Sequence, residues 1–276
     1  MIKDIVANLS VGPARDVATD FAASVASTFD AHLTGVAFNY DPIIPIGDMY
    51  GFPSDVLESQ RIENEKAAKA AVAKLDDAAR RAGVSARARV TGAPVTSAPN
   101  LFAQIARRFD LSVVGQPEPD KPALDRLIVE AALFDSGRPV LVVPYIQRAG
   151  LKLDRVMVCW DGSRSAARAA ADAMPFIVRA KAAEIVIVAT ESAKSDEMPG
   201  ADIAHHLARH GAKAEIDRIV STEVDVASTI LSHAADSSAD LLVMGGYGHS
   251  RLREFILGGA TRGILGAMTV PTLMSH

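Results

Sequence analysis

Residues 241–261 read LLVMGGYGHSRLREFILGGAT, and the fold prediction starts from this stretch. Its apolar run, 241–244, has the length of a buried strand and ends at two glycines. Gly248 and Gly258 follow, ahead of a helical segment. Glycines let the backbone approach a ligand closely, and free N–H groups at a helix N-terminus attract anions. The stretch therefore predicts a phosphate-holding loop, although its spacing is neither that of a Walker A loop nor GxGxxG.

Parts of this stretch occur twice in the chain. The sequence DLSVVG at 110–115 matches DLLVMG at 240–245, and PVLVV at 139–143 matches PTLM at 271–274. A repeat at about half the chain length has a whole domain as its unit, because each copy is large enough to own a core. The sequence therefore predicts a duplicated domain.

Each copy alternates strand and helix signals. The expected strands of the first copy lie at 2–9, 33–39, 85–90, 111–115 and 140–143. Those of the second copy lie at 155–160, 184–190, 213–220, 241–244 and 271–274, with helices at 163–180, 201–210, 224–235 and 261–267. Apolar strands alternating with helices indicate a parallel sheet covered on both faces, and right-handed crossovers make it doubly wound. We predict an α/β fold of two tandem Rossmann-like domains, 1–147 and 151–276, each with a five-stranded parallel sheet.

Composition narrows the classes of function. Apolar residues make up 49% of the chain and charged residues 22%, which is typical of a globular protein. The net charge of −4 gives no electrostatic case for nucleic acid or an anionic membrane as a partner. The single cysteine, Cys159, excludes an internal disulfide framework and fits a reducing cytoplasm. The N-terminal stretch is too polar for a signal peptide, and no apolar run is long enough to cross a membrane. We therefore expect a cytoplasmic protein.

Three features resemble the universal stress protein family in its tandem two-domain form. A predicted strand runs into DGS at 161–163, and the pattern Gly245-x2-Gly248-x9-Gly258 looks like that family's nucleotide-binding signature. The third feature is the closing strand of each copy, GRPVLVV at 137–143 and VPTLM at 270–274. The resemblance covers essentially the whole chain.

The resemblance implies an adenine nucleotide as ligand, with ATP, with or without Mg²⁺, as the expected cofactor. In ATP-binding members the signature glycines hold ribose and phosphates, and the Asp after the first strand holds the adenine. The positions that correspond here are Asp161, Gly245, Gly248 and Gly258. Alignment of the strands adds Val188 as an apolar wall for the adenine and Val220 as a backbone contact.

The signature departs from the family pattern at one position. Gly259 follows Gly258 where the family usually has Ser or Thr. The missing hydroxyl removes a hydrogen bond to phosphate worth about 1–2 kcal/mol. Glycine still caps a helix and leaves its N–H free, so we expect a weakened anion site that includes Gly259 rather than a lost one.

The first copy departs much further from the signature. Gly115 is followed by QPEPD at 116–120, in which the prolines lack N–H groups and the two acidic residues repel phosphate. Asn8 and Leu9 stand where the Asp is expected. We predict that domain 1–147 is a degenerate copy, and that nucleotide binds only in domain 151–276.

Other features are assigned structural roles. His206 and His210 share one face of a predicted helix, and a solvated histidine face is preferred there over a metal site. Cys159 is expected to act as a small buried hydrophobe. The first copy also carries an apolar insertion, residues 41–54, for which burial within the chain, a lid and a dimer contact remain open.

The predicted function is that of a stress-response protein that binds an adenine nucleotide and acts through its conformation or a protein partner. No catalytic constellation is evident, so at most a weak ATPase is expected. The alternatives are an interaction module of the same fold without nucleotide, and a slow ATP hydrolase. The family also implies association through the last strand of each domain, so that 140–143 and 271–274 join the two domains as a pseudo-dimer. A homodimer of the whole chain remains open.

Overall fold

The computed structural model describes residues 1–12, 16–42, 54–118, 124–190, 200–221, 225–246 and 259–276. Within these ranges the strands are β1 (Asp4–Asn8), β2 (His32–Tyr40), β3 (Ala86–Ala93), β4 (Leu111–Gly115), β5 (Val140–Val143), β6 (Arg155–Cys159), β7 (Ala182–Thr190), β8 (Ala214–Ser221), β9 (Leu241–Gly245) and β10 (Thr272–Ser275). The helices are α1 (Val17–Phe29), α2 (Ser54–Ala82), α3 (Ala98–Ala106), α4 (Leu124–Phe134), α5 (Arg164–Asp172), α6 (Met174–Ile177), α7 (Ala201–Arg209), α8 (Val226–Asp236) and α9 (Gly259–Ala267). None of these helices combines the length and apolar character that a membrane crossing needs.

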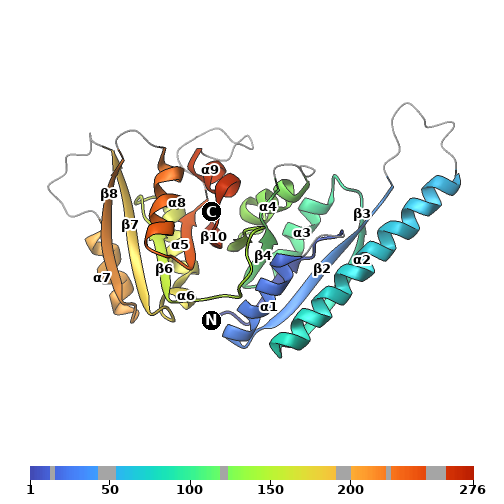
Figure 1. Cartoon of the computed structure of the whole chain (residues 1–276), viewed down its shortest axis with the longest axis horizontal. Helices are drawn as coiled ribbons and strands as arrows, with labels where there is room; N and C mark the ends of the chain where they lie inside the picture. The colour runs from blue at the N-terminus through green and yellow to red at the C-terminus, as the bar shows by residue number, and fades with distance from the viewer. Residues whose placement is uncertain (13–15, 43–53, 119–123, 191–199, 222–224, 247–258) are drawn as a thin grey trace.

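All described strands belong to one ten-stranded sheet with the order β3-β2-β1-β4-β5-β10-β9-β6-β7-β8. Read outward from the centre, each half has the same strand order, and the pairs within each half are parallel. Figure 1 shows the two halves side by side, the first in blue to green and the second in yellow to red. The prediction of a tandem α/β fold with two five-stranded parallel sheets is confirmed.

The two halves meet at the antiparallel pair β5–β10. Leu141 lies opposite Leu273, flanked by the pairs Val142–Thr272 and Val140–Met274. All of these residues are buried. The predicted pairing of 140–143 with 271–274 is therefore confirmed, and it makes one continuous sheet out of two.

Side chains alternate between two apolar cores, one on each face of the sheet. Leu141 and Leu273 belong to the core beneath α1, α2, α5, α6 and α7. Val142 and Met274 belong to the core beneath α3, α4, α8 and α9. Each core runs through both halves without a break, because the β5–β10 register keeps the alternation in phase across the junction.

The repeated aspartate that opens each DLxVxG motif has a structural role. Asp110 Oδ2 accepts hydrogen bonds from the N–H groups of Lys3 and Asp4, at 2.8 and 3.0 Å. Asp240 Oδ2 accepts the same pair from Asp154 and Arg155, at 2.9 and 3.0 Å. In both halves this carboxylate accepts hydrogen bonds from the backbone where the first strand of that half, β1 or β6, begins. It therefore sets the register of the strand pair β1–β4 or β6–β9.

The helix predicted at 163–180 is divided into α5 and α6. Ser163 caps α5, since its Oγ accepts a hydrogen bond from Ala166 N at 3.1 Å. Pro175 lies in the first turn of α6 and cannot donate to the preceding turn, so a single straight helix over this range was wrong. The helix that follows the insertion, α2, is long, and its counterpart α7 is far shorter. Residues 43–53 of the 41–54 insertion lie outside the described residues.

The junction predicts a coupling between its two central leucines. Leu141→Ala and Leu273→Ala each remove a fully buried side chain and should each cost about 2–5 kcal/mol in the free energy of unfolding. Because the two residues are direct cross-strand neighbours, the double variant should deviate from additivity by about 0.5 kcal/mol or more in urea unfolding followed by circular dichroism. Strict additivity would contradict a shared packing site.

The aspartate motif makes a second prediction. Asp240→Ala leaves the N–H groups of Asp154 and Arg155 without this acceptor and should lower the free energy of unfolding by about 1–3 kcal/mol. Asp236→Ala, an exposed site on α8 close in sequence, is the matched control and should change it by less than about 0.5 kcal/mol. Equal effects of the two substitutions in urea unfolding would show that the motif has no such role.

Candidate functional site

The candidate site of the second half lies where the parallel strands β6, β7, β8 and β9 end. Parallel strands place their carboxyl ends at one edge of a sheet, which is the usual ligand edge of an open α/β fold. Asp161 follows β6, Val188 lies near the end of β7, and Gly245 is the last residue of β9. The structure thus brings these three predicted residues to the same edge.

Asp161 is held in an ordered turn. Its Oδ1 accepts a hydrogen bond from Ser163 N at 2.9 Å, and the residue is exposed. Gly162 between them has φ of +72°, a conformation that favours glycine. Ser163 in turn caps α5. The DGS sequence therefore fixes a carboxylate at the sheet edge before any ligand arrives.

The two glycines at the end of β9, Gly245 and Gly246, lie in close contact with neighbouring helices. A Cβ on Gly245 would lie 2.6 Å from both Ala166 N and Ser165 Oγ, at the first turn of α5. A Cβ on Gly246 would lie 2.6 Å from Leu133 Cδ2, on α4 of the other half. Absence of side chains thus lets the end of β9 fit between two helices, one from each half.

The rest of the predicted signature is only partly described. Gly259 is exposed at the start of α9, and a Cβ there would meet nothing within 4 Å among the described residues. Val220 lies in β8 opposite Ala189, with its side chain outside the described part. Gly248 and Gly258 lie outside the described residues.

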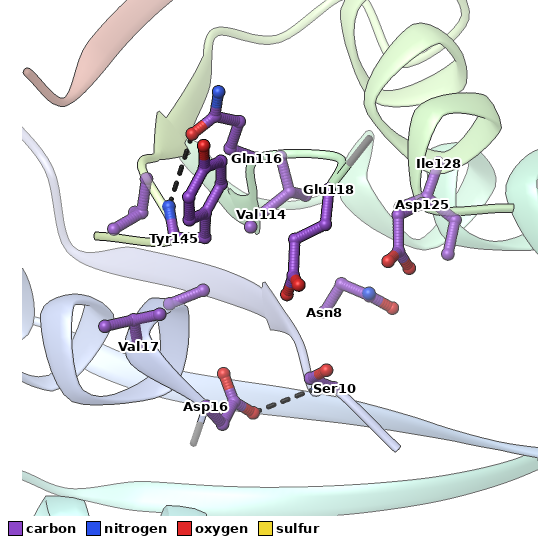
Figure 2. Close-up of a pocket in the computed structure, with 13 residues that line it drawn as sticks. Asn8, Ser10, Asp16, Val17, Val114, Gln116, Glu118, Asp125, Ile128 and Tyr145 are labelled. Carbon is purple, nitrogen blue, oxygen red and sulfur yellow. Dashed lines mark hydrogen bonds between the residues drawn. The ribbon is translucent and has the colours of Figure 1, made fainter. Parts of the chain in front are cut away.

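The equivalent edge of the first half holds an acidic pocket. Asp16, Glu118 and Asp125 line it together with Asn8 and Ser10 (Figure 2). Among the described residues, the rest of the lining contains no lysine or arginine; it consists of Val17, Ala18, Val114, Gly115, Gln116, Ile128, Val143 and Tyr145. Three carboxylates lining one pocket disfavour a phosphate there.

Hydrogen bonds fix one of these carboxylates at the edge. Asp16 caps α1 by accepting from Thr19 N at 3.0 Å and from Thr19 Oγ1 at 2.7 Å. It also accepts from Ser10 N at 2.9 Å. The backbone pattern makes Ser10 the counterpart of Asp161, because Leu9 N bonds to Val36 O as Trp160 N bonds to Val186 O.

The expectation that Asn8 or Leu9 stands at the position of Asp161 was therefore wrong. Asn8 ends β1 in the register of Cys159, and Leu9 is buried in the register of Trp160. The prediction from sequence placed the counterpart of Asp161 one or two residues too early, because Ser10 has no carboxylate that would mark the position.

Gln116 replaces Gly246 in the first half and joins the two halves. Both residues follow their strand and bond to the neighbouring one, Gln116 N to Val143 O at 2.8 Å and Gly246 N to Ser275 O at 2.7 Å. The buried Gln116 side chain donates from Nε2 to Leu265 O of α9 at 2.9 Å. Sequence analysis missed this role, and the one available signal was the alignment of Gln116 with Gly246.

Comparison with known proteins identifies the family of the second half of the chain. Residues 152–276 match the model of the universal stress protein family. This region belongs to the universal stress protein family.

Solved structures match this chain over nearly its whole length. One is a universal stress protein from Archaeoglobus fulgidus DSM 4304, with 16% identity, a TM-score of 0.66 and coverage of 99% of this chain and 97% of that one. Another is a functionally unknown protein from Pseudomonas aeruginosa PAO1, with 14% identity, a TM-score of 0.62 and coverage of 99% and 92%. At these identities the likeness establishes the fold. The sequence has no match among curated proteins.

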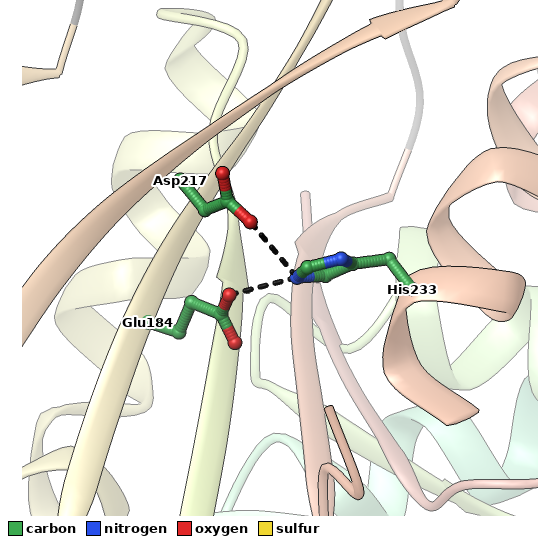
Figure 3. A group of neighbouring side chains, drawn as sticks. All are labelled: Glu184, Asp217 and His233. Atoms are coloured by element: carbon green, nitrogen blue, oxygen red, sulfur yellow. Dashed lines mark hydrogen bonds and ion pairs between the residues drawn. The ribbon is translucent and has the colours of Figure 1, made fainter. Parts of the chain in front are cut away.

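The histidine pair and a second polar cluster complete the inventory of this universal stress protein domain. His206 and His210 share an exposed face of α7 with ring centroids 4.8 Å apart, as predicted. The cluster, from β7, β8 and α8, consists of Glu184, Asp217 and His233 (Figure 3). Sequence analysis missed it, because its members come from three separate elements and form no local motif.

The thiol of Cys159, next to the candidate site, has a raised pKa. Burial raises its pKa to about 12, and the negative charges of Asp161 and Glu184 act in the same direction. A thiol in an unfolded chain has a pKa of about 8.5, so the unfolded state loses its proton first as the pH rises. The stabilisation that comes from a neutral thiol is therefore complete below about pH 8.5 and declines above it.

This pKa predicts slow alkylation of the folded protein. At pH 8 the native thiol should react with iodoacetamide far more slowly than the same thiol in 8 M urea, because little thiolate is present. In unfolding experiments between about pH 8 and 10, the wild type should lose stability relative to Cys159→Ala. Equal alkylation rates in the native and unfolded states would contradict the raised pKa.

Proposed function

We propose that this chain binds an adenine nucleotide, ATP above all, at the carboxyl edge of β6–β9, with or without Mg²⁺. The bound nucleotide would then bias the conformation of the chain, or its contact with a protein partner, in a stress response. Two things support the proposal. The region 152–276 belongs to the universal stress protein family, and the two halves of the chain differ in chemistry at their equivalent edges.

The contrast between the two edges carries the proposal. In the second half β9 ends at Gly245 and is followed by Gly246, and the carboxylate of Asp161 nearby is exposed. In the first half the strand is followed by the bulky Gln116, and the pocket beside it is lined by three acidic residues. A polyphosphate is repelled by such a pocket, so we propose one nucleotide per chain and a degenerate domain at 1–147.

Each predicted residue has a role in this proposal. Asp161 accepts a hydrogen bond from the adenine amino group, and the half-buried Val188 supports the ring. Val220 contributes backbone contacts beside it. The remaining positions let the backbone approach ribose and phosphates, with α9 directing its N-terminus toward the anion; they are Gly245, Gly248, Gly258 and Gly259.

No residue is assigned a catalytic role, and the proposed action is regulatory. The alternatives, an interaction module that has lost its nucleotide and a slow ATP hydrolase, belong to the same fold. The proposed protein partner, which is not identified, and the proposed homodimer follow from the resemblance to the family.

The test is the stoichiometry of ATP binding. Isothermal titration of the full chain with ATP and Mg²⁺ should give about one site per chain. Asp161→Ala should weaken binding at least about tenfold, because a lost hydrogen bond to a charged group is worth roughly 1.5–3 kcal/mol. Gly248→Val should weaken it at least as much.

Ser10→Ala is the matched control, since Ser10 is the exposed counterpart of Asp161 in the first half. It should leave both affinity and stoichiometry unchanged. Two sites per chain would refute the degenerate first half. No binding at millimolar ATP would reject the proposal in favour of an interaction module, and turnover lost in Asp161→Ala would favour a hydrolase.

A further inference from the structure

A second cluster of ligand-bearing side chains lies on the sheet face beneath α8. Glu184 is the third residue of β7, Asp217 lies on β8, and His233 lies in the last turn of α8. Figure 3 shows the carboxylates of Glu184 and Asp217 directed at the imidazole of His233. One ligand atom from each lies within 4.8 Å of the others. The cluster lies near the start of β7, away from the carboxyl edge where the nucleotide is proposed.

The distances are close to those around a bound ion. His233 Nε2 lies 3.5 Å from Asp217 Oδ2 and 2.7 Å from Glu184 Oε1. Ligand atoms about 2.0–2.2 Å from a tetrahedral zinc ion lie roughly 3.3–3.5 Å apart. The separation of His233 from Asp217 already fits this range. The separation of His233 from Glu184 would increase by less than about 1 Å when an ion replaces the hydrogen atom between the two groups.

Glu184 is buried with few polar partners, an arrangement that favours a cation beside its carboxylate. Its side chain is 9% exposed, and its Oε2 has no hydrogen-bond partner among the described residues. The nearest opposite charge on that side is Arg155 Nη1, at 3.5 Å. A buried carboxylate is costly unless paired, and one hydrogen bond and one long ion pair are a weak set of partners.

The fold itself does not require a carboxylate at this position. Thr34 is the counterpart of Glu184, because β1 pairs with β2 in the register in which β6 pairs with β7. In the first half Thr34 Oγ1 accepts from Arg87 Nε at 3.1 Å, and Arg89 is the counterpart of Asp217. The same place in the fold is thus occupied by arginines in one half and by metal-ligand types in the other.

We propose that Glu184, Asp217 and His233 bind a divalent transition-metal ion such as Zn²⁺. An imidazole with two carboxylates suits zinc and its neighbours, and two negative charges match a divalent ion. The Asp217 side chain is 48% exposed, which gives the ion access and leaves an outward position for water. Arg155 then orients the Glu184 carboxylate from outside the coordination shell.

The test is a Co²⁺ titration of metal-free protein without nucleotide. The background carries His206→Ala and His210→Ala, which remove the exposed histidine pair on α7 as a rival site. This background should bind about one Co²⁺ per chain with a visible d–d absorption band, and Zn²⁺ should displace the Co²⁺. Thermal unfolding should move to higher temperature with added Zn²⁺.

Added to this background, Asp217→Asn and His233→Gln should each weaken binding at least about tenfold. Asp202→Asn is the matched control, because it removes one negative charge from an exposed site on α7, which covers the opposite face of the sheet, and it should leave binding unchanged. Asp217→Asn changes a half-exposed residue, so circular dichroism should report an intact fold. No binding at 0.1 mM Co²⁺, or equal binding by Asp217→Asn and the background, overturns the proposal. Neither result bears on the nucleotide.

Discussion

The architecture depends on the antiparallel pairing of β5 with β10. Within each half every strand pair is parallel, and a parallel sheet must be covered on both faces and leaves its edge strands open. β5 and β10 are the inner edges of the two halves, and pairing them satisfies both at once. Leu141 opposite Leu273 keeps the inward and outward alternation in phase, so two cores extend across the whole molecule.

The contacts across this junction differ between the two halves. Because β5 and β10 pair, residues of each half contact the other half. Leu133 of α4 packs against Gly246, and the carbonyl oxygen of Leu265 of α9 accepts a hydrogen bond from Gln116. The two contacts are counterparts, one apolar and one polar. In the first half Gln116 follows β4 and forms a hydrogen bond to the second half. In the second half Gly246 occupies the equivalent position after β9. The difference between glutamine and glycine at this position thus gives a polar contact between the halves in one case and an apolar contact in the other.

Much of the fold could be predicted, because its determinants are local and repeated. The DLxVxG motif occurs twice, and its aspartate makes the same pair of backbone hydrogen bonds in each half. The Asp161 turn and the Ser163 cap were also readable, since both depend on residues within a few positions. Pro175 was a visible breaker, but an alanine-rich run outweighed it in the helix prediction.

What could not be predicted depends on contacts between distant segments. Gln116 reaches Leu265, and Glu184 meets His233 only because α8 crosses back over β7. Ser10 was missed as the counterpart of Asp161, since register is fixed by hydrogen bonds to β2 and not by residue type. The side-chain chemistry at an edge or beneath a helix becomes visible only when the sheet is assembled.

The central claim is that one fold, present twice, carries a single nucleotide site. Photolabelling the full chain with 8-azido-ATP, followed by mass spectrometry of its peptides, tests it most directly. The account predicts adducts only in peptides from residues 152–276, around the ends of β6, β7 and β8, and their loss when unlabelled ATP competes. Competed adducts in peptides around Asn8, Asp16 or Gln116 would contradict it.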